Sequence, residues 1–354
     1  MSDKFTENMS EKIGEMPEDI VFIGEKKVEQ LSIEVIEYYR NGNVKDFKIE
    51  NIREILPLNN DCITWINITG VHDGEHIKEI GALLELHPLI VEDILNTTQH
   101  PKMQDYGDCI FFITKMLYYY GGEITSEQVS LVLSDNYVLS FKESKEDIFK
   151  HVRQKIHRKK GRNFKSGADY LAYQLIDAVV ENYIGITEQI SDKIEDLEDA
   201  IDGKDLRQDS IDELGNLKRI LNRLRKTVRP TNDFIVHINT LDTDLIKDET
   251  EPFFHNLLDI SARANSAIES CRDMLADNLQ IYNLSVANRF NDTLRMLTAF
   301  SLLFIPITFI ASLYGMNFEH IPELKWEYGY FVVLGVMLAI SVGMMVYFRR
   351  RKWM

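Results

Sequence analysis

The chain has 354 residues, of which 45% are apolar and 27% are charged, and its formal net charge is −16. This size indicates one large folded domain or two ordinary ones, and the acidic balance excludes nucleic acid as the main partner, because phosphate binding requires a basic surface. The charge is uneven: up to Asp292 there are 34 Lys and Arg against 53 Asp and Glu, and the remainder holds 6 against 3. An acidic body with a basic end fits a protein that handles cations.

The first 18 residues are polar and contain no apolar core, so they are predicted to form a disordered lead-in and not a signal peptide. Residues 19–165 are predicted to form a cytoplasmic α/β domain. β-Branched and aromatic runs predict its strands, and helical spacing of apolar residues predicts its helices. The predicted strands are 32–39, 62–68, 109–120, 126–133 and 137–141, and the predicted helices are 77–85 and 89–96.

The three cysteines, Cys62, Cys109 and Cys271, are far apart and show no CxxC spacing. This pattern excludes a disulfide framework and a cysteine-rich zinc site, and predicts reduced, buried thiols in a cytoplasmic body. The motifs GxxxxGK[ST], GxGxxG, HExxH and GxSxG are also absent from the sequence. We therefore predict no catalytic residue and no enzyme activity.

Residues 166–293 are predicted to form a helical bundle and a stalk. Apolar residues recur at helical spacing from 168 to 201 and again through ELGNLKRILNRLRKTV, where the helix is predicted to stop at Pro230. A third stretch has no proline between Pro252 and Pro306. One helix from Thr250 to Tyr314 has 65 residues and would span roughly 100 Å. That length predicts a stalk that continues into a membrane.

Two uncharged runs follow, 296–314 with 19 residues and 328–348 with 21. Because a helix of about 20 apolar residues crosses a bilayer, transmembrane helices are predicted at 294–314 and 328–348, joined by an external loop at 315–327. The tail 349–354 opens with four cations, which mark the cytoplasmic side. We expect a multi-pass protein of a prokaryotic cell membrane with both termini in the cytoplasm.

Small and polar residues form a stripe along the first predicted span and the helix before it, with apolar breaks. Steps of three or four residues place the stripe on one helical face. Such a face points to protein or to water, so it either holds helices together or lines a pore. A pore requires an oligomer, because one hairpin cannot enclose it. The stripe consists of Asn283, Ala287, Asn291, Leu294, Thr298, Ser301, Ile305, Thr308 and Ser312.

The segment Tyr314-Gly315-Met316-Asn317, followed by FEHIPELKW, resembles the signature of the CorA family of divalent-cation channels. TWINITG at 64–70 and HPLIVEDILNTTQHPK at 87–102 resemble that family's cytoplasmic domain, and the resemblance covers nearly the whole chain from about residue 18. It implies an α+β membrane protein: a cytoplasmic α/β domain on a long helical stalk with two C-terminal transmembrane helices, assembled as a funnel-shaped homopentamer. The implied activity is passage of Mg²⁺, and also Co²⁺ or Ni²⁺, into the cytoplasm. The lipid bilayer and further copies of the chain are the only partners implied.

The resemblance makes the stripe pore-lining, with Leu294 and Ile305 as apolar constrictions that close by dewetting. It places the selectivity filter at Gly315, Met316 and Asn317. Mg²⁺ gives up its water reluctantly, so a ring of neutral amides can hold the hydrated ion weakly enough for conduction. Gly315 is expected where the chain leaves the helix and a Cβ would obstruct it.

The external loop carries Glu319, Glu323 and Glu327 against Lys325. Its negative charge would concentrate divalent cations at the entrance of the pore, although the same residues also fit an ordinary solvated loop.

In the family, Mg²⁺ bound between neighbouring cytoplasmic domains closes the channel. At the family's main site, Mg²⁺ bridges two carboxylates of neighbouring domains. Asp93 matches one of these carboxylates, but Gln280 stands at the second position, where the family often has an aspartate. Glu92 and Asp177 match two acids of a second site, whose third position is Asn256 in this chain. Asp277 lies one turn before Gln280, and Asp259 lies three residues after Asn256, so either acid can substitute. The regulatory candidates are Glu92, Asp93, Asp177, Asn256, Asp259, Asp277 and Gln280.

Because Gln280 and Asn256 each stand where the family has an acid, each removes a charge, and we expect inhibition by internal Mg²⁺ to be weaker or displaced. A solvated acidic face explains Asp177 and Asp259 nearly as well. Two other functions stay open: a zinc transporter of the same superfamily, against which the intact Met316 argues, and a non-conducting membrane-anchored helical scaffold, against which the stripe argues.

Overall fold

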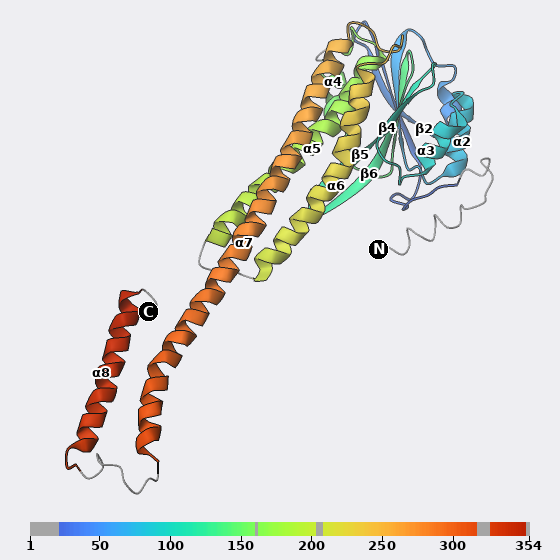
Figure 1. Ribbon diagram of the computed structural model, residues 1–354. Coiled ribbons are helices and arrows are strands. Elements are labelled where there is room, and N and C mark those ends of the chain that lie inside the picture. The colour runs from blue at the N-terminus through green and yellow to red at the C-terminus, as the bar shows by residue number, and fades with distance from the viewer. Residues whose placement is uncertain (1–20, 160–161, 203–207, 317–325, 352–354) are drawn as a thin grey trace. The chain divides into compact units, whose positions relative to one another are not determined.

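The computed structural model describes residues 21–159, 162–202, 208–316 and 326–351 (Figure 1). The predicted lead-in, Asn317 and the glutamates at 319 and 323 lie outside these ranges. The described residues cluster into two units. The first contains the sheet and the helices up to Ala276, and the second contains the chain from Asp277 onward.

The first unit is built on a seven-stranded sheet in the order β2-β1-β3-β7-β6-β5-β4. Only β3 and β7 pair in parallel, and every other neighbouring pair is antiparallel. The mixed sheet bears out the expected α/β domain. The strands are β1 Ser32–Tyr39, β2 Val44–Ile49, β3 Cys62–Thr69, β4 Lys102–Asp105, β5 Ile110–Tyr120, β6 Glu123–Leu133 and β7 Tyr137–Lys142.

The sequence prediction missed β2 and β4, which are the two edge strands of the sheet. β2 reads VKDFKI and β4 reads KMQD, so charged and polar residues break the apolar alternation that marks a strand. Charged side chains on an edge discourage pairing with a second chain. The same residues that protect the edges therefore conceal them in the sequence.

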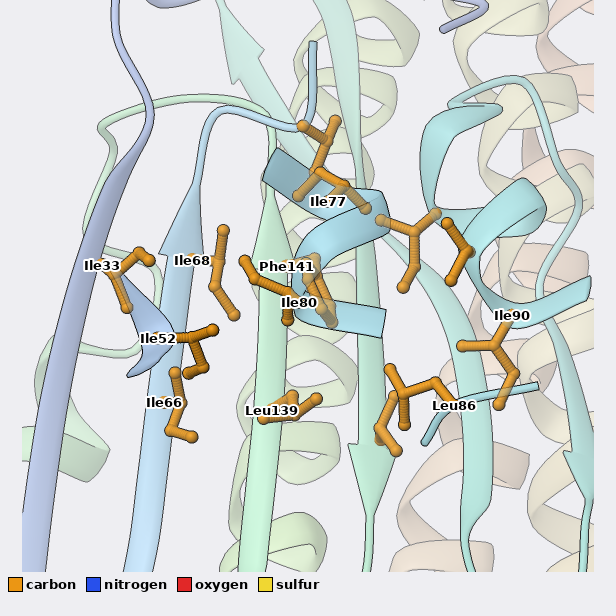
Figure 2. Packing of buried hydrophobic residues seen from close by; sticks show 14 of the residues in the cluster. Ile33, Ile52, Ile66, Ile68, Ile77, Ile80, Leu86, Ile90, Leu139 and Phe141 are labelled. Atoms are coloured by element: carbon orange, nitrogen blue, oxygen red, sulfur yellow. The ribbon is translucent and has the colours of Figure 1, made fainter. Parts of the chain in front are cut away.

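Helices α2 (Gly74–Leu83) and α3 (Pro88–Leu95) cover one face of the sheet. The side chain of Asp73 caps α2 by accepting from the backbone N–H of His76, and Pro88 opens α3 at a position where its missing N–H costs nothing. Figure 2 shows isoleucines of the two helices, Ile80 and Ile90 among them, packed with sheet residues such as Phe141. Burial of each such side chain contributes about 1.5–3 kcal/mol.

The opposite face of the sheet is covered by α4 (Lys150–His157), α5 (Ala168–Asp202) and α6 (Gln208–Ile238). The Tyr183 hydroxyl of α5 donates to the carbonyl of Lys115 at 2.6 Å, and the Phe234 ring of α6 lies 6.1 Å from that of Phe112. The first part of α7 (Glu251–Tyr314) joins this layer through Ser261, which donates to Asn232 of α6 at 3.0 Å. The unit therefore has three layers, with the sheet in the middle.

The prediction that the second long helix stops at Pro230 was wrong, because α6 continues through it to Ile238. Proline removes one backbone hydrogen bond and disfavours a helix interior. Here the extra turns bury Phe234, Ile235 and Ile238 in the first unit. Tertiary burial outweighs the local penalty.

The prediction of one continuous helix from the bundle into the membrane segment is confirmed within a residue. α7 contains 64 residues, Glu251–Tyr314, and α8 spans Gly329–Arg350. Both contain a window apolar enough to cross a membrane, with mean hydropathies of 2.1 and 2.4 and only 6% of each window buried. The three cysteines are free and buried, as predicted.

Candidate ion pathway and regulatory residues

The polar stripe of α7 is exposed along its whole length. All nine positions from Asn283 to Ser312 are open, including the apolar Leu294 at 42% and Ile305 at 62%. Their steps of three or four residues average close to the ~3.6 residues of a helical turn, so the stripe keeps its phase along the helix. Nothing in the second unit covers this face of the described chain.

The less exposed residues of the same helix segment form a second stripe. At ~100° per residue, this second stripe lies on the side of α7 opposite the polar one. A matching row on α8 is also less exposed, namely Val333, Met337, Ile340, Met344 and Phe348. The two rows indicate that α7 and α8 face each other along apolar surfaces and leave the polar stripe outward. The second stripe of α7 consists of Ala299, Leu303, Pro306, Ile307, Ile310 and Tyr314.

The polar members of the stripe can accept hydrogen bonds. The Thr298 hydroxyl donates to the carbonyl of Leu294 at 2.7 Å, within its own helix. Its proton is thereby used, and the lone pairs of its oxygen stay available. An acceptor of this kind suits the water shell of a cation.

Helix α7 ends at Tyr314, and Gly315 donates its N–H back to the carbonyl of Ala311 at 3.0 Å. A Cβ built on Gly315 would lie 3.3 Å from that same carbonyl oxygen, which is tighter than ordinary contact. This agrees with the expectation that a side chain would crowd the helix exit. The filter role of Gly315 and Met316 stays a prediction, and Asn317 lies outside the described residues.

Asp93 is 7% exposed on α3, and its carboxylate is already engaged. Lys102 of β4 places Nζ 2.7 Å from Oδ2, and the Gln99 amide donates to Oδ1 at 2.8 Å. Sequence reasoning did not single out Lys102 and Gln99, although both stand in the quoted 87–102 motif. Their meeting with Asp93 depends on the turn between α3 and β4, which no helical spacing reveals.

Asp177 lies on α5 with one buried oxygen that has no hydrogen-bond partner in the described chain. Burial, reinforced by the neighbouring Glu181, raises the pKa of Asp177 to about 6. Tyr173, one turn earlier, lies near the Asp177 carboxylate and near the Asn256 side chain of α7. The structure therefore brings Asp177 and Asn256 to one place, around Tyr173.

The remaining regulatory candidates are not gathered with them. Asp259, Asp277 and Gln280 are exposed on α7, and Glu92 is half-buried on α3, across the sheet from α5. Among the residues that the structure describes, no three His, Cys, Asp or Glu side chains lie close enough to hold a metal ion. The regulatory Mg²⁺ site between neighbouring copies stays a prediction.

The raised pKa of Asp177 predicts a pH-dependent stability. The folded state holds this proton more tightly than an unfolded aspartate with a pKa of 3.8, so ionisation destabilises the wild-type chain as pH rises from about 4 to about 6. With chelator present, Asp177→Asn is expected to be more stable than wild type by about 1–2 kcal/mol above pH 7, after allowance for solvent screening. The difference should vanish near pH 4. Thermal unfolding across this range measures it, with Glu188→Gln at an exposed position of the same helix as control, and equal midpoints at every pH would contradict the burial of the charge.

A mixed-sheet domain, a long helix α7 that ends in an apolar segment and a second apolar helix α8 fit an integral membrane protein. Its sequence assigns the family: the profile described as "CorA-like Mg2+ transporter protein" matches residues 60–350, and the chain belongs to that family. This is a family of metal-ion transporters and not of enzymes.

Individual relatives agree. The chain is 38% identical over 349 residues to the cobalt/magnesium transport protein CorA of Thermotoga maritima, covering 98% of this chain and 99% of the relative. It is 30% identical over 289 residues to the putative metal ion transporter YfjQ of Bacillus subtilis, covering 82% and 89%. The fold matches the complete CorA magnesium transporter of Methanocaldococcus jannaschii with a TM-score of 0.77 at 18% identity, over 90% of this chain and 98% of that one.

Proposed function

We propose that this protein is a channel that carries divalent cations, chiefly Mg²⁺ and also Co²⁺ or Ni²⁺, into the cytoplasm. The observation that carries the proposal is the polar stripe, which stays exposed on one face of α7 while the apolar face turns to α8. A polar face inside a membrane requires protein or water opposite it. The relatives named as magnesium and cobalt transport proteins support the choice of ion.

A single chain leaves the stripe open, so the proposal includes an oligomer, a homopentamer with both termini in the cytoplasm. Copies of α7 would turn their stripes toward a common axis and enclose a water-filled path. The stripe's Asn, Ser and Thr oxygens would contact the water shell of the ion, and Leu294 and Ile305 would form its apolar constrictions. The copies of α8 would then face lipid, which fits the high exposure of α8 and its mean hydropathy of 2.4.

The membrane potential supplies the driving force. A divalent ion gains roughly 4.6 kcal/mol per 100 mV, which corresponds to more than ~10³-fold accumulation. An open channel would overload the cell, so the proposal includes closure by cytoplasmic Mg²⁺ bound between neighbouring copies, with Asp93 and Asp177 as ligands.

Mg²⁺ uptake into liposomes containing the purified protein tests the function, with Zn²⁺ as a second ion. Wild type should take up Mg²⁺ at low internal Mg²⁺, and Asn317→Ala should lose most of the uptake. Asn288→Ala removes an exposed amide from α7 outside the stripe and should leave it unchanged. Absence of wild-type uptake would support a non-conducting scaffold, and a preference for Zn²⁺ would assign the chain to the zinc branch.

A further inference from the structure

The environment of Asp93 does not fit a directly bound metal ion in the folded chain. One carboxylate oxygen lies 2.7 Å from the Lys102 ammonium, and the other accepts from the Gln99 amide at 2.8 Å. Charge-assisted contacts at these distances are strong. A divalent cation that coordinates Asp93 must first replace a cation that the chain itself supplies.

We propose that Lys102 is a tethered competitor for divalent cations at Asp93, so that metal binding there is an exchange of an ammonium for a metal ion. The inference adds a mechanism to the proposed regulation by Mg²⁺, and its consequence for transport rests on the proposed function. The exchange itself is a binding property of the cytoplasmic domain and can be measured without transport.

The two partners are held differently, which decides which of them moves. The backbone carbonyl of Asp93 accepts from the buried Gln128 amide of β6 at 3.0 Å, and the residue is 7% exposed. The Lys102 side chain is 32% exposed, against 10% for that of Asp93. Lys102 also begins β4, an edge strand, and its long stem can swing into solvent. The carboxylate therefore stays in place, and the ammonium leaves.

The competition between Lys102 and Mg²⁺ sets the Mg²⁺ concentration at which Asp93 binds the metal ion. A free carboxylate at this position would attract Mg²⁺ at low concentration, whereas a carboxylate already paired with a lysine binds it only when Mg²⁺ is abundant. This direction agrees with the neutral residues Gln280 and Asn256 at the other regulatory positions. All three features weaken the response to internal Mg²⁺.

Titration calorimetry of Mg²⁺ into the full-length protein in detergent tests the exchange, at constant ionic strength. Lys102→Gln retains a hydrogen-bonding amide but removes the charge, and should bind Mg²⁺ on the order of tenfold more tightly, because an adjacent unit charge changes the affinity by about that factor. Lys102→Arg retains the charge and should resemble wild type. Lys48→Gln is the matched control, because Lys48 pairs with Glu34 at 2.9 Å on another part of the sheet.

The double variant Asp93→Asn/Lys102→Gln assigns the gain to the proposed carboxylate, and it should lose the tighter binding. Unchanged Mg²⁺ affinity in Lys102→Gln would overturn the inference. A gain that persists in the double variant, or that Lys48→Gln reproduces, would overturn it as well. In liposomes, Lys102→Gln should close at about tenfold lower internal Mg²⁺. A wild type that does not transport while the binding differences hold would refute the proposed function and leave the exchange at Asp93 standing.

Discussion

Replacing Ser301 by tryptophan is expected to abolish Mg²⁺ uptake, reducing the rate by about 100-fold or more, because a bulky apolar side chain would fill and dewet the path. Ser301 lies in the middle of the stripe, between Thr298 and Ile305, and is exposed on α7. The same substitution occurs in every copy of a homo-oligomer, so the obstruction is repeated around the axis. Uptake of Mg²⁺ into liposomes at a fixed membrane potential measures the effect.

Phe300→Trp is the control for this variant, since it places the same tryptophan side chain one residue away. Phe300 is 47% exposed on α7 but does not belong to the stripe, and a tryptophan there should change uptake by less than about twofold. Both variants must first show wild-type oligomeric size in detergent. A Ser301→Trp protein that still conducts at the rate of Phe300→Trp would refute the pore-lining role of the stripe.

Trp65→Ala is expected to destabilise the mixed-sheet domain by about 3–5 kcal/mol. Trp65 is fully buried on β3, and its indole N–H donates to Ser140 at 2.9 Å. Its ring centroid lies 5.9 Å from that of Phe149 in an edge-to-face arrangement, and the Arg153 guanidinium lies 5.4 Å from the Trp65 ring centroid. The alanine variant leaves a cavity between β3 and α4 and removes the indole donor from the buried Ser140 hydroxyl. Thermal unfolding followed by circular dichroism should show a midpoint lower by about 10 °C.

Two further variants separate cavity formation from the general loss of an aromatic ring. Trp65→Phe refills much of the space without the N–H and should lose about 1–3 kcal/mol. Tyr120→Ala removes an aromatic ring that is 69% exposed at the end of β5, and should change stability by less than about 1 kcal/mol. Equal midpoints for Trp65→Ala and Tyr120→Ala would show that the β3–α4 packing does not support the domain.

The sequence by itself determined the features that depend on the spacing of apolar and polar residues along a short stretch of chain. Strand β1 was predicted at its observed bounds, and α7 within one residue, since alternation and uninterrupted helical spacing are properties of neighbouring residues. The phase of the nine-residue stripe follows from the same periodicity, and the two apolar helices follow from the length of their uncharged runs. The family signature at Tyr314–Asn317 added a function to this pattern, which spacing alone left open between helix packing and a pore.

Only the tertiary structure decided what depends on contacts between distant segments. Burial of Phe234 and Ile238 carries α6 past Pro230, against its local preference. The orientation of the stripe away from α8 follows from which face of α7 is covered. The turn between α3 and β4 brings Lys102 to Asp93, nine positions away in the chain. A residue's charge can be read from the sequence, but the partner that neutralises it is determined by folding, because an ion pair needs two groups within a few ångströms of each other.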